Sequence, residues 1–175
     1  MHFPNLARLD ISESFIKRMK TLKTAHSVTL AFWAGLNILV SSVFLFHTEA
    51  LHFYFFTMNI SWNVVNAFVA VFLYAHHNDV FDRPISNLHQ MEYQKHIEKA
   101  MVFNIGLDMT YIATGFAMYY YGDLPQVLHN ELWLGFGISV ILQGSYLLIQ
   151  DMVFYKLHRK NHSKVYPYWE NLLLG

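Results

Sequence analysis

The sequence predicts an all-α polytopic membrane protein, a bundle of four transmembrane helices with both termini in the cytoplasm. Three observations predict this fold. The 175-residue chain is 54% hydrophobic and only 14% charged, it contains four long stretches nearly free of charged residues, and its lysines and arginines lie outside those stretches. A bilayer core of about 30 Å needs about 20 apolar helical residues, so each stretch is long enough to cross it. The composition argues against a disordered or nucleic-acid-binding chain.

Residues 1–24 are predicted to form a cytoplasmic basic amphipathic segment before the first span. Apolar residues recur at helical spacing on one face and basic residues occupy the other, namely Phe15, Met19 and Leu22 against Lys17, Arg18, Lys20 and Lys23. Two interpretations are open. The apolar face lies on an anionic inner leaflet, or the segment is a solvated flank that only sets topology.

The transmembrane bundle is expected over residues 25–156. Its spans lie near 28–46, 54–75, 100–121 and 132–153, with a cytoplasmic loop at 78–97 and a cytoplasmic tail at 157–175. Lysine and arginine occur only before the first span, between the second and third, and after the fourth. The other two loops carry Glu49, Asp123 and Glu131 instead. The positive-inside rule therefore places both termini and the middle loop in the cytoplasm.

Each predicted span carries polar residues near its midpoint. They are Asn37 in the first span, Asn63 and Asn66 in the second, Asp108 and Tyr111 in the third, and Gln143 in the fourth, with Asn59 and Asn104 on the same faces of the second and third spans. Within a span they follow helical spacing and so share one face. Because an unsatisfied amide facing lipid costs several kcal/mol, we expect these faces to point inward. Six glycines are expected to permit close helix packing, namely Gly35, Gly106, Gly115, Gly135, Gly137 and Gly144.

Asp108 is the most informative single residue. A carboxylate at the centre of a spanning helix costs about 2.5 to 3.5 kcal/mol on insertion scales, and no lysine or arginine lies at its depth. One interpretation is a site for a proton, small cation or polar ligand, formed with the amides and Tyr111. The other is that these groups only join the helices, each hydrogen bond contributing about 0.6 kcal/mol.

The eleven histidines provide weaker candidates for a metal or haem site. On the cytoplasmic side His89, Glu92 and His96, with His76 and His77 nearby, could hold a divalent metal. On the outer side the candidates are His47, His52 and His129. Histidines near the inner ends of the spans could also ligate haem. No catalytic motif occurs, so we expect no enzymatic activity and identify no specific cofactor.

The motif residues of the spans resemble those of a family of small bacterial four-helix integral membrane proteins of unknown function. They are Asn59, Trp62, Asn63, Val65 and Asn66, then Gly106, Leu107, Asp108, Tyr111, Ile112 and Gly115, and finally Gln143 and Gly144. The resemblance covers most of the four-helix region. It implies a bacterial inner-membrane location and supplies no activity.

Three functions are therefore open. The first is a bundle that binds or conducts a proton, cation or polar ligand at Asp108 and its neighbours. The second is a structural or accessory subunit of a larger membrane complex or homo-oligomer. The third is a haem- or metal-dependent redox protein that uses the cytoplasmic histidines.

Overall fold

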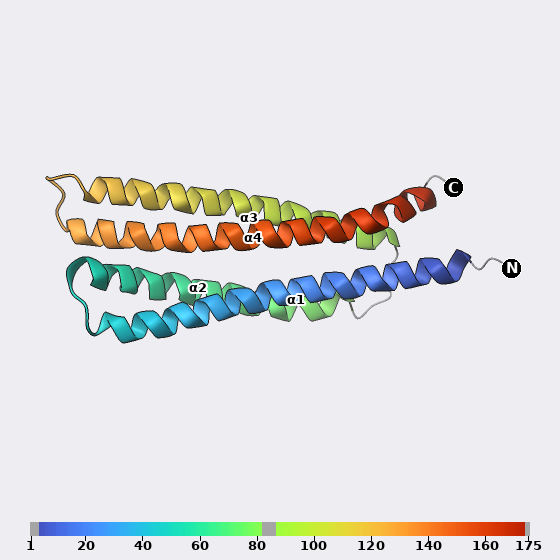
Figure 1. The fold of residues 1–175 in the computed structure, drawn as a ribbon, viewed down its shortest axis with the longest axis horizontal. Coiled ribbons are helices and arrows are strands. Elements are labelled where there is room, and N and C mark those ends of the chain that lie inside the picture. The colour runs from blue at the N-terminus through green and yellow to red at the C-terminus, as the bar shows by residue number, and fades with distance from the viewer. Residues whose placement is uncertain (1–3, 82–86, 174–175) are drawn as a thin grey trace.

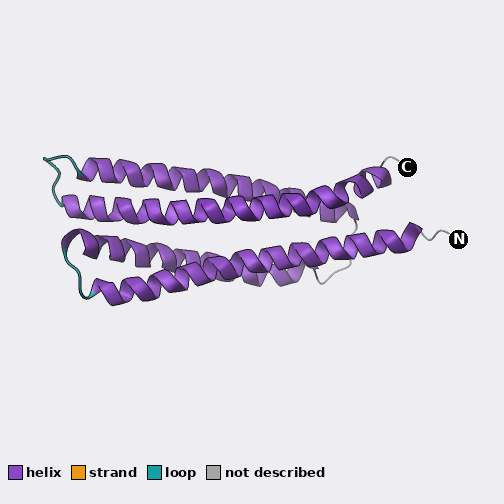
Figure 2. Ribbon diagram, in the orientation of Figure 1, coloured by secondary structure: helices purple, strands orange, loops and turns teal. Residues whose placement is uncertain are grey.

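The computed structural model describes residues 4–81 and 87–173, with side chains over 13–75 and 89–167. Within these ranges it is all-α, as predicted (Figure 2). Its helices are α1 (Pro4–Leu45), α2 (Ala50–Phe81), α3 (Asn87–Gly122) and α4 (Asn130–Leu173). Successive helices run in opposite directions. α1 begins and α4 ends at one end of the molecule, and the α1–α2 and α3–α4 connections lie at the other (Figure 1).

The helices extend well beyond the predicted spans. The expected loop at 78–97 contains the end of α2, which continues to Phe81, and the start of α3 at Asn87. The expected tail is likewise the end of α4, which continues to Leu173. A helix of 44 residues, at about 1.5 Å per residue, is about twice as long as a bilayer core is thick. The bundle therefore projects past the apolar region at one end.

Helix packing is uneven among the described residues. α1 packs on α2, α3 packs on α4, and α4 also packs on α1 and α2. The backbone of α3 packs mainly on α4, and its side chains also contact α1 and α2. A seam therefore lies between α2 and α3, and the side chains that border it are those of the candidate site described below.

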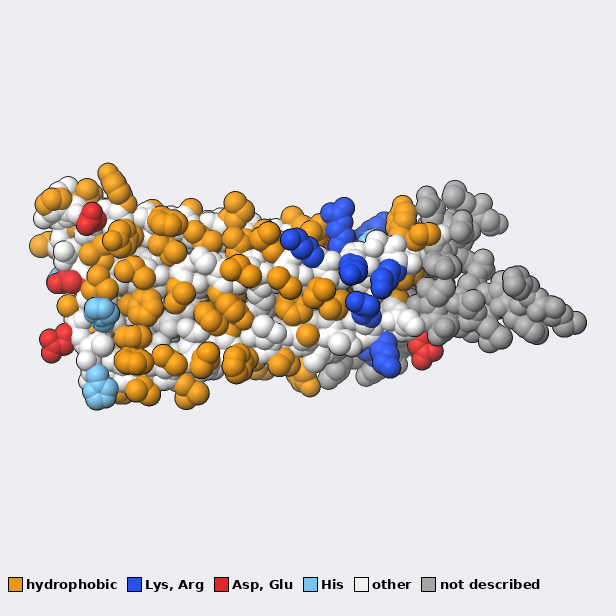
Figure 3. Space-filling view, viewed as in Figure 1, with side chains coloured by type: hydrophobic (Ala, Val, Ile, Leu, Met, Phe, Trp, Pro, Cys, Tyr) orange, Lys and Arg blue, Asp and Glu red, His pale blue; other side chains and the backbone are white. Residues whose placement is uncertain are grey.

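The distribution of side chains is the reverse of that in a soluble protein. Large apolar side chains are exposed on every helix, including Phe32 (70%), Phe68 (73%), Phe103 (66%) and Ile149 (64%). The interior instead holds polar side chains, and Asn63 and Gln143 are completely buried. The visible face in Figure 3 is apolar over most of its length, with lysine and arginine gathered toward the end where α1 begins.

Among the described residues, three helices are long and apolar enough to cross a membrane, namely α1, α2 and α4. α3 is not one of them, because its central part carries Asn104 and Asp108 and three tyrosines precede its last residue. Its exposed face is nevertheless apolar, with Phe103 and Phe116 more than half exposed.

The amphipathic start of α1 lies against protein. Phe15 and Met19 form a buried cluster with Val165 of α4, and Met91 and Ile97 of α3 pack against it. The interpretation that this apolar face lies on a lipid leaflet is therefore wrong for Phe15 and Met19. The basic end of the molecule is held together by its own small apolar core.

The glycines divide into two groups. A side-chain Cβ at Gly137 would lie 2.7 Å from the Gly115 carbonyl oxygen, and one at Gly135 would lie 2.5 Å from the Leu51 carbonyl oxygen. These glycines, with Gly144, permit close approach of α4 to its neighbours, as predicted. The prediction is wrong for Gly35 and Gly106, where a Cβ would meet nothing within 4 Å.

Candidate functional site

An amide network joins α1, α2 and α4 in the interior, with Asn59 at its centre. The Asn59 Nδ2 donates to Asn37 Oδ1 at 3.0 Å and to Ser41 Oγ at 2.7 Å. Gln143 Nε2 on α4 donates to Asn59 Oδ1 and, at 3.4 Å, to Asn37 Oδ1. Three helices thus meet at one buried side chain.

The remaining groups of this network are also paired. Trp33 Nε1 donates to Gln143 Oε1 at 2.8 Å, and the Trp33 ring stacks on Tyr146 at 3.7 Å. Asn63 Nδ2 donates to the Asn59 carbonyl oxygen at 2.8 Å. Because the amides satisfy one another, no donor or acceptor of Asn37, Asn59, Asn63 or Gln143 is left without a partner among the buried side-chain atoms described. Hydrogen bonds among these side chains connect α1, α2 and α4.

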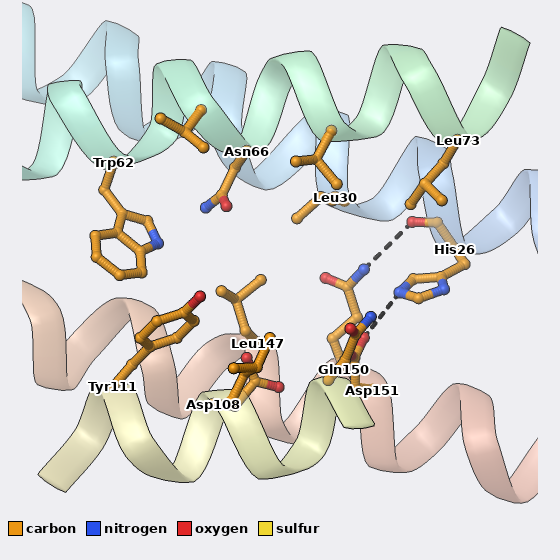
Figure 4. A pocket seen from close by; sticks show the side chains of 14 residues that line it. His26, Leu30, Trp62, Asn66, Leu73, Asp108, Tyr111, Leu147, Gln150 and Asp151 are labelled. Atoms are coloured by element: carbon orange, nitrogen blue, oxygen red, sulfur yellow. Dashed lines mark hydrogen bonds and ion pairs between the residues drawn. The ribbon is translucent and has the colours of Figure 1, made fainter. Parts of the chain in front are cut away.

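A cavity of about 350 Å³ lies beside this network, where the seam between α2 and α3 meets α1 and α4. Figure 4 shows Trp62 and Asn66 on α2 across from Tyr111 and Asp108 on α3. Its lining residues are His26, Leu30, Trp62, Val65, Asn66, Val69, Leu73, Asn104, Leu107, Asp108, Tyr111, Leu147, Gln150 and Asp151. The volume is in the range of small-molecule pockets.

Two buried oxygen atoms from the lining residues lack a hydrogen-bond partner in the described part of the chain. One is Asp108 Oδ2, on a side chain that is 4% exposed, and the other is Gln150 Oε1, on a side chain that is 6% exposed. Gln150 Nε2 donates to the His26 carbonyl oxygen at 3.2 Å. Since a carbonyl can only accept, this bond identifies the unpaired end of Gln150 as its oxygen. Both unpaired atoms are therefore acceptors.

A histidine–carboxylate pair lies at the end of the cavity nearer the basic end of the bundle. His26 Nε2 on α1 lies 2.9 Å from Asp151 Oδ1 on α4 (Figure 4). The His26 ring also stacks on Phe154 at 4.6 Å. A second, smaller space of about 180 Å³ shares His26, Leu73 and Asn104 with the cavity and reaches Lys23. The cavity therefore continues toward the basic end.

The structure divides the predicted site residues between these two regions. Asn37, Asn59, Asn63 and Gln143 belong to the amide network, whereas Asp108, Tyr111, Asn66 and Asn104 line the cavity. Asn66 links the two, because its Nδ2 lies 3.4 Å from Asn63 Oδ1. Asn104 lines the cavity although its side chain is exposed.

His26, Gln150, Asp151 and Trp62 line the cavity but are not among the binding residues that the sequence predicts. Gln150 carries a usable signal, since it follows Gln143 by seven residues and so shares its face. Asp151 ends the charge-free fourth stretch and gives no such signal. Its partnership with His26 depends on α1 and α4 being neighbours, which the sequence pattern does not show.

The candidate metal ligands do not gather into a site. No group of three histidine or acidic side chains suited to a metal ion occurs among the residues whose side chains are described. On α3 the side chains of His89, Glu92 and His96 are exposed. Those of His47, His52 and His129, near the opposite end of the molecule, are also exposed. The side chains of His76 and His77 lie outside the described residues.

Comparison with known proteins identifies a family without supplying a function. Residues 29–152 match the model described as Family of unknown function (DUF6992). This range contains the amide network, Asp108, Gln150 and Asp151, and it begins just after His26. No curated protein and no solved structure matches the chain.

Proposed function

The chain belongs to DUF6992, a family of unknown function, and from its geometry we propose that it is a membrane protein that binds a positively charged or proton-donating ligand beside Asp108. The observation that carries this proposal is the unpaired Asp108 Oδ2, buried at the wall of a cavity that also contains an unpaired amide oxygen. An unsatisfied buried acceptor costs about 1 to 3 kcal/mol, and more if it is charged. A bound donor would recover that free energy.

The amide network supports this choice of site by contrast. Its members already have partners, so a ligand there would have to break existing hydrogen bonds. Asp108 and Gln150 each have an unpaired acceptor, so a ligand can bind them without breaking a hydrogen bond to that atom. We therefore assign the network to helix association and the cavity to binding.

We further propose that all four helices cross the membrane and that both termini lie on the cytoplasmic side of an inner membrane. The apolar exposed face of α3 supports a fourth crossing, because Phe103, Met109 and Phe116 are each more than half exposed. The concentration of lysine and arginine at one end supports the orientation. The cavity then opens toward the cytoplasmic half of the bilayer.

The test uses a single cysteine in the cavity, because the natural chain has none. Leu107→Cys places a thiol beside Asp108, and Phe103→Cys, on the lipid-facing surface of the same helix, is the matched control. Each purified variant, in lipid nanodiscs, is labelled with a cationic trimethylammonium methanethiosulfonate and with its anionic sulfonate counterpart. The measured quantity is the ratio of the two labelling rates.

We expect the cationic reagent to label Leu107→Cys about tenfold faster than the anionic one, a ratio that corresponds to about 1.4 kcal/mol. Adding Asp108→Asn should remove that preference, whereas Asp123→Asn, the same charge change in the far loop, should not. Phe103→Cys should react slowly with both reagents. An unreactive Leu107→Cys, or an equal rate with both reagents, would contradict the proposal. A thermal unfolding measurement checks that Asp108→Asn is folded.

A further inference from the structure

The hydrogen-bonding groups of the cavity restrict the chemical class of the ligand as well as its charge. Both unpaired polar atoms, Asp108 Oδ2 and Gln150 Oε1, are acceptors, so a complementary ligand must present at least two hydrogen-bond donors. A nearby second carboxylate, Asp151, is already paired with His26. An anion or a ligand with acceptors only would leave these atoms unpaired.

Aromatic rings occupy the end of the cavity that lies away from His26 and Asp151, beyond Asp108 (Figure 4). The Trp62 and Tyr111 rings meet edge to face at 4.9 Å, and both residues line the cavity. Ring faces of tryptophan and tyrosine attract organic cations in a desolvated site. The site therefore suits an ammonium group better than a neutral amide or alcohol.

A bare inorganic ion fits the site poorly. A volume of about 350 Å³ is more than a single small cation fills. Divalent metals in proteins require several oxygen or nitrogen ligands at close range, and the described side chains provide no such group of histidine and acidic residues. The ligand thus has a body as well as a charge.

The remaining wall is aliphatic and open to the side. Leu30, Leu107 and Leu147 line the inner part of the cavity, while Val65 and Val69 of α2 line its edge. Val65 is 60% exposed and Val69 is 43% exposed, so the cavity merges with the apolar outer surface between α2 and α3. An apolar group bound there would keep contact with lipid.

We infer that the ligand is an amphipathic amine, a protonated primary amine attached to an apolar chain or ring. The ammonium lies between Asp108 and Gln150, and the apolar part lies along the seam between α2 and α3. This inference rests on the proposed function and identifies the chemical class of its ligand.

Protection of Leu107→Cys from labelling by methyl methanethiosulfonate, an uncharged reagent, measures occupancy of the cavity. Three probes are compared in nanodiscs at neutral pH: dodecylamine, dodecan-1-ol and methylammonium. We expect dodecylamine to slow labelling at least tenfold and at concentrations at least tenfold below those of methylammonium, while dodecan-1-ol has no effect. Phe103→Cys, labelled in parallel, should be unaffected by dodecylamine, which controls for changes in the bilayer.

Two further variants test the assigned contacts. Asp108→Asn should abolish protection by dodecylamine, and Gln150→Leu should weaken it about tenfold. Equal protection by dodecan-1-ol would overturn the inference, because the amine would then not be recognised. Equal protection by methylammonium would overturn it too, because the apolar part would contribute nothing. In both cases a retained preference for cationic reagents upholds the proposed function, whereas its loss defeats the function itself.

Discussion

At the scale of single residues, buried hydrogen bonds connect the helices, whereas in soluble helical bundles apolar side-chain packing does so. Asn59 is 3% exposed and its side chain contacts Asn37, Ser41 and Gln143 on two other helices. In lipid, apolar side chains gain little by leaving the bilayer for the protein interior, so interhelical hydrogen bonds and close packing take a larger share. Removing this one amide therefore affects three helices.

We predict that Asn59→Ala lowers the free energy of unfolding by about 2 kcal/mol, from three interhelical bonds at about 0.6 kcal/mol each. The matched control is Asn104→Ala, which makes the same change at an exposed position. It should alter stability by less than about 0.5 kcal/mol. Reversible unfolding in mixed detergent micelles measures both. Equal effects of the two substitutions would show that the network does not join the helices.

The residues also show what a sequence can reveal about such a site. Helical spacing and the cost of placing amides in lipid correctly predict that Asn37, Asn59 and Gln143 turn inward. They do not predict which polar groups find partners. Asp108 stays apart from the amide network because α3 packs mainly on α4, and that arrangement is a property of the whole bundle.

At the scale of helices, α3 and α4 are held together by backbone contact. The Gly137 position lies against the Gly115 carbonyl oxygen, and Gly144 lies against Ile112. Small residues of this kind let two helix backbones approach closely and gain dispersion energy along their length. The spacing of glycines predicts such contacts, but glycines on the outer surface, such as Gly106, look the same in the sequence.

We predict that Gly137→Ala destabilises the protein by about 1 to 3 kcal/mol, because the added methyl group must displace backbone atoms. Gly106→Ala adds the same group where a Cβ meets nothing within 4 Å. This control should leave the melting temperature unchanged or raise it, since alanine favours the helix by about 1 kcal/mol. Thermal unfolding of the two variants side by side gives the comparison, and a melting temperature for Gly137→Ala at or above that of Gly106→Ala would contradict it.

At the scale of the whole molecule, the long helices separate an apolar region from a basic end with its own core. The amphipathic pattern of the first segment predicts a helix there, and α1 is indeed helical over Pro4–Leu45. The pattern alone does not say what covers the apolar face. Phe15 and Met19 pack against α3 and α4 because those helices also extend past the apolar region, which their sequences do not make evident.

The concentration of lysine and arginine at one end of the bundle also predicts its orientation in the membrane. If the basic end is cytoplasmic, it faces the lumen of right-side-out vesicles. Thiols introduced there at Ser14, Glu92 and Ser163 should then react with a membrane-impermeant maleimide only after the vesicles are opened. A thiol at Asp123, at the far end of α3, should react before opening. All four positions lie outside the cavity and Ser14, Glu92, Asp123 and Ser163 are all exposed, so reactivity reports sidedness. The decisive pair is Glu92 and Asp123, which flank the central part of α3. If both react from the same side, α3 does not cross the membrane, and Asp108 would then lose the apolar surroundings that make its unpaired oxygen costly.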